Sequence, residues 1–205
     1  TEGNSIYLPP FVATFEEQEA NFQAYKVFTT HQTGRMEFGS FVYEFGSAGE
    51  HAPATGFSRE EQVEASRAAK AAETGEAVKE RVAPATAMQR YFNMFEDRSL
   101  ILGLFTIAED TRIDAQTGRE YGGIRRWLRV LQEHEANHRP PIEMMGLRQA
   151  FMENLLRSSL GVPETMRWPV SLNEYLRRAI AALKVVELEG ATVQDSAEVA
   201  AAIYD

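Results

Sequence analysis

Apolar side chains recur every three to four residues over most of the chain from Ala85 onward. A polar break near Asp97 interrupts the first stretch, and a last helix is expected to open at Thr192, because Thr192 and Asp195 have the spacing of a capping box. This period predicts a mainly α-helical fold. The helical patterns before that last helix cover roughly residues 85–115, 119–138, 144–160 and 171–188.

The N-terminal part has a different pattern. Pro9 and Pro10 keep the first residues extended, because proline disfavours helix at and before its own position. A helix is then predicted from Glu16 to about Thr30. Gly34 stands where the C-terminal stop of such a helix is expected.

A β element is predicted directly after this glycine. In "RMEFGSFVYEF" apolar and polar side chains nearly alternate, which is the period of a strand with one buried face. The pattern predicts one short β-strand or hairpin near residues 36–45, with Gly39 at a bulge.

Residues 46–83 interrupt the apolar pattern. They begin with the small and polar "GSAGEHAPATGFS" and continue with a stretch rich in Ala, Glu and Lys that has little apolar face. We expect a mobile, solvated insertion here, within a single helical domain spanning residues 1–205.

Composition excludes several classes of site. The chain has no cysteine and four histidines, so a metal site would need histidine and carboxylate ligands. Its net charge of −9 argues against nucleic acid as a partner. No apolar run has the length of a membrane span, and the start of the chain does not read as a signal peptide, so we expect a cytoplasmic protein with no membrane partner.

One literal zinc-peptidase motif is present. "HEANH" places His134 and His138 on one helix face, with Glu135 between them. Pro140 and Pro141 should end the helix directly after His138, whereas a zinc-peptidase helix continues and is followed by a third ligand. The context therefore favours a solvated helix end.

A second candidate is the acidic pair Glu109 and Asp110. At helical spacing Glu109 falls on an apolar stripe, where a carboxylate needs a cation or several hydrogen-bond donors. The candidate partners are Arg112, Arg35 and His31. Two roles remain open for Glu109, a ligand or catalytic acid and a structural ion pair.

The segment "YGGIRRWLRVL" predicts an amphipathic helix with a basic outer face. Arg125, Arg126 and Arg129 alternate with apolar residues that face the core. Such a patch in an acidic chain is either a solvated face or a surface that steers an acidic partner.

Several segments together resemble a known family. The chain resembles the N-terminal region of the von Willebrand factor A (VWA) proteins of the CbbO/NorD family, which work with MoxR-type AAA+ ATPases. The resemblance covers most of the chain outside the predicted insertion. The segments that carry it are, in order, "YLPPFV", "NFQAYKVFTTHQTGRMEFGSF", "LFTIAEDTRID", "REYGGIRRW", "RPPIEMMGLRQAFMENLLRSSLG" and "ATVQDSAEVAAAIYD".

The resemblance implies a non-catalytic adaptor. In this family a hexameric MoxR-type ATPase, which carries ATP and Mg, does the mechanical work, and the VWA protein connects it to a client enzyme. The CbbO branch, which residues 120–127 and 139–161 resemble more closely, implies Rubisco activation by removal of inhibitory sugar phosphates. The family's VWA domain binds a divalent metal through a DxSxS motif that does not occur here, so that domain is expected to be absent from this chain, which holds no cofactor.

Within this resemblance, "HQTGR" has the outline of a degenerate zinc motif. Gln32 stands in place of the general base and Arg35 in place of the second histidine, so His31 alone would bind zinc poorly. One interpretation is a degenerate zincin-like scaffold reused for binding; the other is a plain helix stop at Gly34. The candidate degenerate or structural site consists of His31, Gln32, Arg35, Glu109, Asp110 and Arg112.

Three alternatives to Rubisco activation stay open at this point. The same segments fit the NorD branch, which implies activation of nitric oxide reductase. A metallopeptidase using His134 and His138 is a different class, and zinc content separates it from an adaptor. A scaffold that works without an ATPase is the third.

Overall fold

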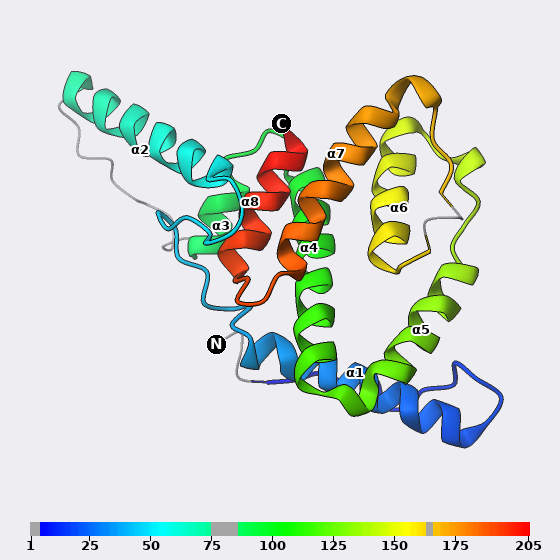
Figure 1. Ribbon diagram of the computed structural model, residues 1–205. Helices are drawn as coiled ribbons and strands as arrows, with labels where there is room; N and C mark the ends of the chain where they lie inside the picture. Colours follow the sequence, from blue (N-terminus) through cyan, green and yellow to red (C-terminus); the bar gives the residue numbers. More distant parts are fainter. Residues whose placement is uncertain (1–4, 75–85, 163–165) are drawn as a thin grey trace.

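The structure is a computed structural model that describes residues 5–74, 86–162 and 166–205. These residues form helices and connecting segments and contain no strand, which confirms the predicted mainly α-helical class. None of their helices combines the length and the apolar character needed to cross a membrane. The α-helices are α1 (Gln18–Glu37), α2 (Thr55–Thr74), α3 (Ala87–Phe92), α4 (Arg98–Glu120), α5 (Arg125–Asn137), α6 (Leu147–Ser159), α7 (Asn173–Leu183) and α8 (Val193–Tyr204) (Figure 1). Short 3₁₀ helices occur at η1 (Gly122–Ile124), η2 (Ile142–Met144), η4 (Val170–Leu172) and η5 (Lys184–Glu187).

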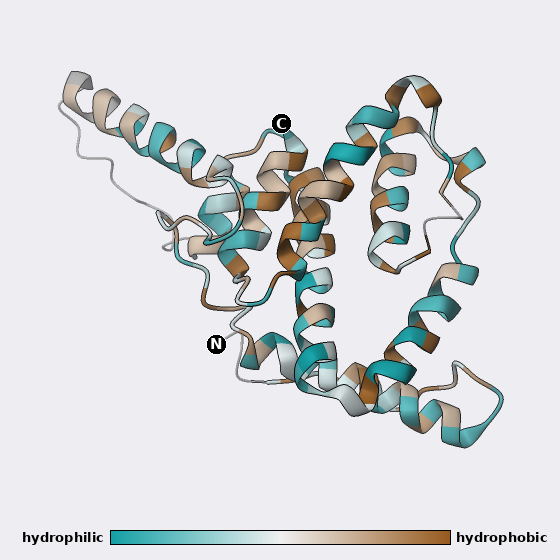
Figure 2. Ribbon diagram, in the orientation of Figure 1, coloured by the Kyte–Doolittle hydropathy of each residue, from teal (hydrophilic) through white to brown (hydrophobic). Residues whose placement is uncertain are grey.

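The long helix α4 is the centre of the fold. It packs against α1, α6 and α8, which lie around it in Figure 1. Ile101, Leu104 and Ala108 are fully or almost fully buried and recur every three to four residues, so one stripe of α4 faces the core. In α8 the buried Ala200 and Ala201 are small, which lets that helix approach closely. Figure 2 shows apolar residues gathered where α8 packs against α4 and α7.

A smaller apolar cluster joins α1 to α5. Ala24 and Val27 of α1 are buried against Leu131 of α5, with Phe15 and Trp127 packed around them. This cluster is separate from the two clusters that line α4 and α8. In Figure 1 α5 leads away from the foot of α4, and it packs against α1.

The helix boundaries follow the predicted signals where a cap is present. Asp97 caps α4 through a 2.9 Å hydrogen bond from the Leu100 amide, which confirms the break predicted near Asp97. At the start of α8 the Thr192 amide donates to the Asp195 carboxylate over 2.8 Å, as the capping-box spacing predicts. α5 ends at Asn137, ahead of Pro140, as expected.

The predicted β-strand or hairpin near residues 36–45 is wrong. The helix α1 continues to Glu37, and the chain then turns back in a Schellman motif. The Ser40 amide bonds the Arg35 carbonyl at 2.9 Å, and Gly39 adopts a φ of 74° rather than forming a bulge. The alternation misled because Tyr43 and Phe45 pack against the core from a loop that has no neighbouring strand.

The predicted helix stop at Gly34 is also wrong. Gly34 lies inside α1 and is buried. A Cβ added there would come within 2.8 Å of Thr117 Oγ1 and 3.4 Å of Ile113 Cγ2, both on α4. This glycine therefore marks a close approach of α1 and α4, a role that local sequence does not distinguish from a C-terminal stop.

The expected solvated insertion at 46–83 begins with a segment that contacts the rest of the fold. The backbone amides of Gly46, His51 and Gly56, the last of which lies in the first turn of α2, donate hydrogen bonds to carboxylates of α2 and α8. Beyond those residues α2 projects away from the body in Figure 1. Residues 75–83 lie outside the described part of the chain.

Candidate functional site

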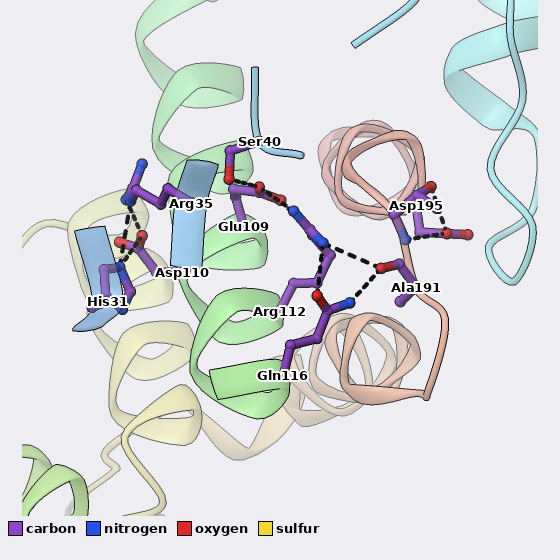
Figure 3. Close-up of polar contacts among 10 residues, drawn as sticks. His31, Arg35, Ser40, Glu109, Asp110, Arg112, Gln116, Ala191 and Asp195 are labelled. Atoms are coloured by element: carbon purple, nitrogen blue, oxygen red, sulfur yellow. Dashed lines mark hydrogen bonds and ion pairs between the residues drawn. The ribbon is translucent and has the colours of Figure 1, made fainter. Parts of the chain in front are cut away.

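Two polar clusters lie on different faces of α4. Successive helical residues differ by about 100°, so the adjacent carboxylates of Glu109 and Asp110 point in different directions (Figure 3). We call the set of Ser40, Glu109, Arg112 and Gln116 the Glu109 cluster. The set of His31, Arg35, Asp110, Asp114 and Gln132 is called the His31 cluster.

The Glu109 cluster is a buried ion pair. Glu109 and Arg112 each expose 1% of their surface, and Arg112 Nε and Nη2 lie 2.8 and 2.6 Å from the two Glu109 oxygens. Ser40 donates a 2.5 Å hydrogen bond to the same carboxylate from the turn after α1. Burial alone would raise the pKa of Glu109, but the hydrogen bonds and charge of Arg112 outweigh it and lower that pKa. Glu109 is thus held ionised.

Arg112 also ties α4 to the segment before α8. Its Nη1 donates to the Ala191 carbonyl at 3.2 Å, and Gln116 Nε2 donates to the same oxygen at 2.6 Å (Figure 3). The ion pair therefore connects three parts of the fold, namely the turn at Ser40, the middle of α4 and the start of α8. With both charges satisfied in this way, the arrangement fixes how the elements pack.

The His31 cluster joins α1, α4 and α5. His31 Nδ1 lies 2.8 Å from Asp114, and its Nε2 lies 3.4 Å from Asp110, which also pairs with Arg35. Gln132 of α5 donates to the second Asp114 oxygen at 3.0 Å. Burial alone would lower the pKa of His31, but the two carboxylates raise it to about 9. His31 is therefore an imidazolium at neutral pH that bridges two aspartates.

This geometry does not support a zincin-like scaffold. A metal-binding histidine must offer a free lone pair, whereas His31 Nδ1 lies 2.8 Å from Asp114 and its Nε2 lies 3.4 Å from both Asp110 and Arg35 Nε. Glu109 faces Arg112 instead of His31, and Gln32 belongs to neither cluster. Across the described residues no group of three or more His, Asp or Glu side chains is arranged to hold a metal ion.

The second zinc motif lies at the exposed end of α5. The rings of His134 and His138 stack with centroids 4.1 Å apart, and His138 Nδ1 donates to the His134 carbonyl at 2.8 Å. Phe15 contacts His134 edge-on, and Glu135 is exposed. These contacts fit the helix end that the two following prolines predict.

Four further buried carboxylates, those of Glu60, Glu153, Asp195 and Glu198, were not predicted as site residues. Asp195 accepts the amides of His51 at 2.6 Å and Ala52 at 3.0 Å, and Glu198 accepts those of Gly56 and Phe57 at 2.5 and 3.0 Å. Glu60 accepts the hydroxyl of Tyr43 and the amide of Gly46.

These carboxylates differ in pKa. Burial is the largest influence on each, and it raises the pKa of Glu60 and of Glu198. At Asp195 the amides of Thr192, His51 and Ala52 outweigh burial and lower the pKa. Asp195 had a sequence signal in its capping spacing, whereas the contacts to residues 46–57 are long-range and leave no local pattern.

A groove of about 1070 Å³ runs between α4 and α6. Leu100, Ile107, Met152 and Leu156 are among its apolar lining residues, and Asp110 of the His31 cluster also lines it. Comparison of the chain with protein families, curated proteins and solved structures found no match. The function therefore has to be argued from the residues and their arrangement.

Proposed function

We propose that this chain is a non-catalytic, cytoplasmic adaptor domain that links a hexameric MoxR-type AAA+ ATPase to a client enzyme. The observation that carries the proposal is the position of the segments that resemble the CbbO/NorD family. Residues 21–41 form α1 and its turn, 104–114 lie in α4, 139–161 include α6, and 191–205 include α8. These distant segments pack around α4 as one helical body.

The polar clusters support a binding role for this body. The charges of Glu109 and Arg112 are paired and buried, and His31 is held between two aspartates. Groups held in this way stabilise one relative placement of α1, α4 and α8, which suits a rigid part that transmits contacts between proteins. In this proposal ATP and Mg belong to the ATPase, and a divalent metal belongs to a VWA domain.

Rubisco is the client we propose. Removal of inhibitory sugar phosphates from its active site would then be driven by the ATPase. This assignment rests on the likeness of residues 120–127 and 139–161 to the Rubisco-associated branch, and nitric oxide reductase is the alternative client. The chain shows no glycine-rich phosphate-binding loop in its sequence, so the proposal places ATP hydrolysis on the partner.

Two parallel activation assays test the proposal. The protein that contains this chain is purified with a MoxR-type ATPase and added either to inhibitor-blocked Rubisco or to immature nitric oxide reductase. Each assay is run with and without ATP, and with and without the ATPase. We expect the ATPase to co-purify and Rubisco to regain activity only when both ATP and ATPase are present.

Other outcomes assign the protein differently. Recovery of the reductase alone would move it to the nitric oxide reductase branch. Absence of any ATPase binding would overturn the adaptor proposal. One equivalent of bound zinc that is lost in a His134→Ala/His138→Ala variant would favour the peptidase instead.

A further inference from the structure

The outer face of α5 is basic in an otherwise acidic chain. Arg125, Arg126 and Arg129 are all exposed, while Leu131 on the other side of the helix is buried against α1. Over the whole sequence acidic residues exceed basic ones, with a net charge of −9. A basic patch on such a chain attracts anionic groups, although the net negative charge of the rest of the molecule repels them.

The arginines of this face differ from most others in the structure. Arg59, Arg90 and Arg148 each form an ion pair with a carboxylate of this chain. By contrast, Arg126 and Arg129 have no ion pair with any residue that the structure describes. Their charge is therefore available to a second molecule.

A polar recess lies beside these arginines. It has a volume of about 370 Å³ and is lined by Arg129, Gln132 and Asn137 of α5 together with residues 160–162. Glu133 also lines it and is the one carboxylate there. The recess offers the guanidinium of Arg129 and the amide of Asn137, a donor set that binds a carboxylate, while the amide of Gln132 donates to Asp114.

We propose that the outer face of α5, with Arg126, Arg129 and this recess, docks a short acidic segment of a partner protein. The inference rests on the adaptor proposal for its biological setting and deepens it by naming a surface. Arg125 and Arg129 are four residues apart, a rise of about 6 Å, so the face spans too short a distance to follow a nucleic-acid backbone. A glutamate or aspartate run of a few residues matches it.

Binding of a labelled peptide of about ten glutamates to the chain tests this surface directly. We expect Arg126→Glu/Arg129→Glu to weaken binding about tenfold or more, since it replaces attraction with repulsion. The matched control is Arg177→Glu/Arg178→Glu, which reverses two exposed arginines on α7 and should change the Kd less than about twofold. Raising NaCl from about 50 to 300 mM should weaken the parent more than the α5 variant.

Glu133 gives a test of opposite sign. Glu133→Gln removes the carboxylate from the recess and should tighten peptide binding by about twofold or more. Equal binding by the parent and both double variants would overturn the proposal, as would tighter binding of an oligothymidine of equal charge than of the peptide. Thermal melts show whether each variant is folded. If Arg126→Glu/Arg129→Glu is unfolded, Arg126→Ala/Arg129→Ala takes its place in the binding assay.

The two proposals fail separately. If the ATPase co-purifies with the parent but the peptide does not bind, the surface is wrong and the adaptor stands. If the peptide binds through α5 but no ATPase does, the surface stands and the adaptor proposal falls.

Discussion

At the scale of single residues, the buried charge pair between Glu109 and Arg112 has a large predicted effect on stability. Glu109→Ala leaves the guanidinium of Arg112 buried without its counter-charge, which should cost about 3 kcal/mol of unfolding free energy. Glu109→Gln keeps an oxygen that accepts hydrogen bonds and should cost less. Urea unfolding of both variants measures the difference.

The paired replacement Glu109→Leu/Arg112→Met is the control for this pair. It removes both charges together, so it should be more stable than Glu109→Ala, because no buried charge is left alone. If Glu109→Ala and Glu109→Gln unfold like the parent but abolish client activation, the residue belongs to a functional site and the structural interpretation is wrong.

The raised pKa of His31 predicts that the free energy of unfolding depends on pH. Its pKa in the folded protein is about 9, against an ordinary value of 6.5, so the folded state holds the proton more tightly than the unfolded state. The resulting stabilisation is complete below pH 6.5 and is lost as pH rises from 6.5 to 9. Its size is on the order of 3 kcal/mol.

Unfolding free energy measured from pH 6 to 9.5 tests this prediction. The parent should lose more stability over that interval than His31→Gln, which cannot be protonated, and the two curves should converge at the alkaline end. Parallel curves over the whole interval would show that His31 is not protonated between the two aspartates.

At the scale of elements, the contact between α1 and α4 depends on Gly34. Alanine normally stabilises a helix by up to about 1 kcal/mol relative to glycine. At Gly34 the added Cβ would lie 2.8 Å from Thr117 Oγ1, so Gly34→Ala should destabilise the fold by about 1–3 kcal/mol. Gly118→Ala is the matched control, because a Cβ at Gly118 meets nothing within 4 Å and should be neutral or stabilising.

The denaturant midpoints of Gly34→Ala and Gly118→Ala measure this difference in stability. A second check is Gly34→Ala combined with Thr117→Ala, which removes the atom that the new Cβ meets. Thr117 Oγ1 has no hydrogen-bond partner among the described residues, so its loss should restore part of the stability. Equal midpoints for Gly34→Ala and Gly118→Ala would contradict the close approach of the two helices.

The sequence predicted helix boundaries correctly where capping residues or prolines stand next to the boundary. The caps at Asp97 and Thr192 and the prolines after His138 set helix boundaries through their own neighbours. The prediction of a strand near residues 36–45 was wrong because alternation reports only which side chains are apolar. A strand also needs a neighbouring strand to pair with. The prediction of a helix stop at Gly34 was wrong because the contact that favours glycine there is with Thr117 on another helix, α4.

The site shows the same division between local and long-range information. The burial expected for Glu109 and its pairing with Arg112 follow from residues three apart on one helix. Asp114 was missed, although it lies one turn from Asp110 on the same face and the spacing was available. Ser40 and the Ala191 carbonyl come from distant segments, so only the folded chain places them against Glu109 and Arg112.

At the scale of the whole molecule, Asp195 connects two segments that are 144 residues apart in the sequence. Its carboxylate accepts the amides of His51, Ala52 and Thr192, so it holds the loop before α2 against the start of α8. Gly49 fits this contact because a Cβ there would lie 2.6 Å from Asp195 Oδ1. The hydrogen bonds favour the ionised form, so this stabilisation is present above pH 3.8 and is lost as pH falls through the lowered pKa.

Asp195→Ala should therefore release the loop from α8. It leaves amides of His51 and Ala52 without their acceptor, a loss of about 2–4 kcal/mol, and hydrogen exchange at those two amides should accelerate strongly. Exchange in the centre of α4 should change less, because Leu104 and Ala108 are buried by other elements. Glu50→Ala, at an exposed position of the same loop, should leave exchange unchanged. Undiminished protection of the His51 and Ala52 amides in Asp195→Ala would mean that the loop is held by other contacts, and that the carboxylate of Asp195 serves only to cap α8.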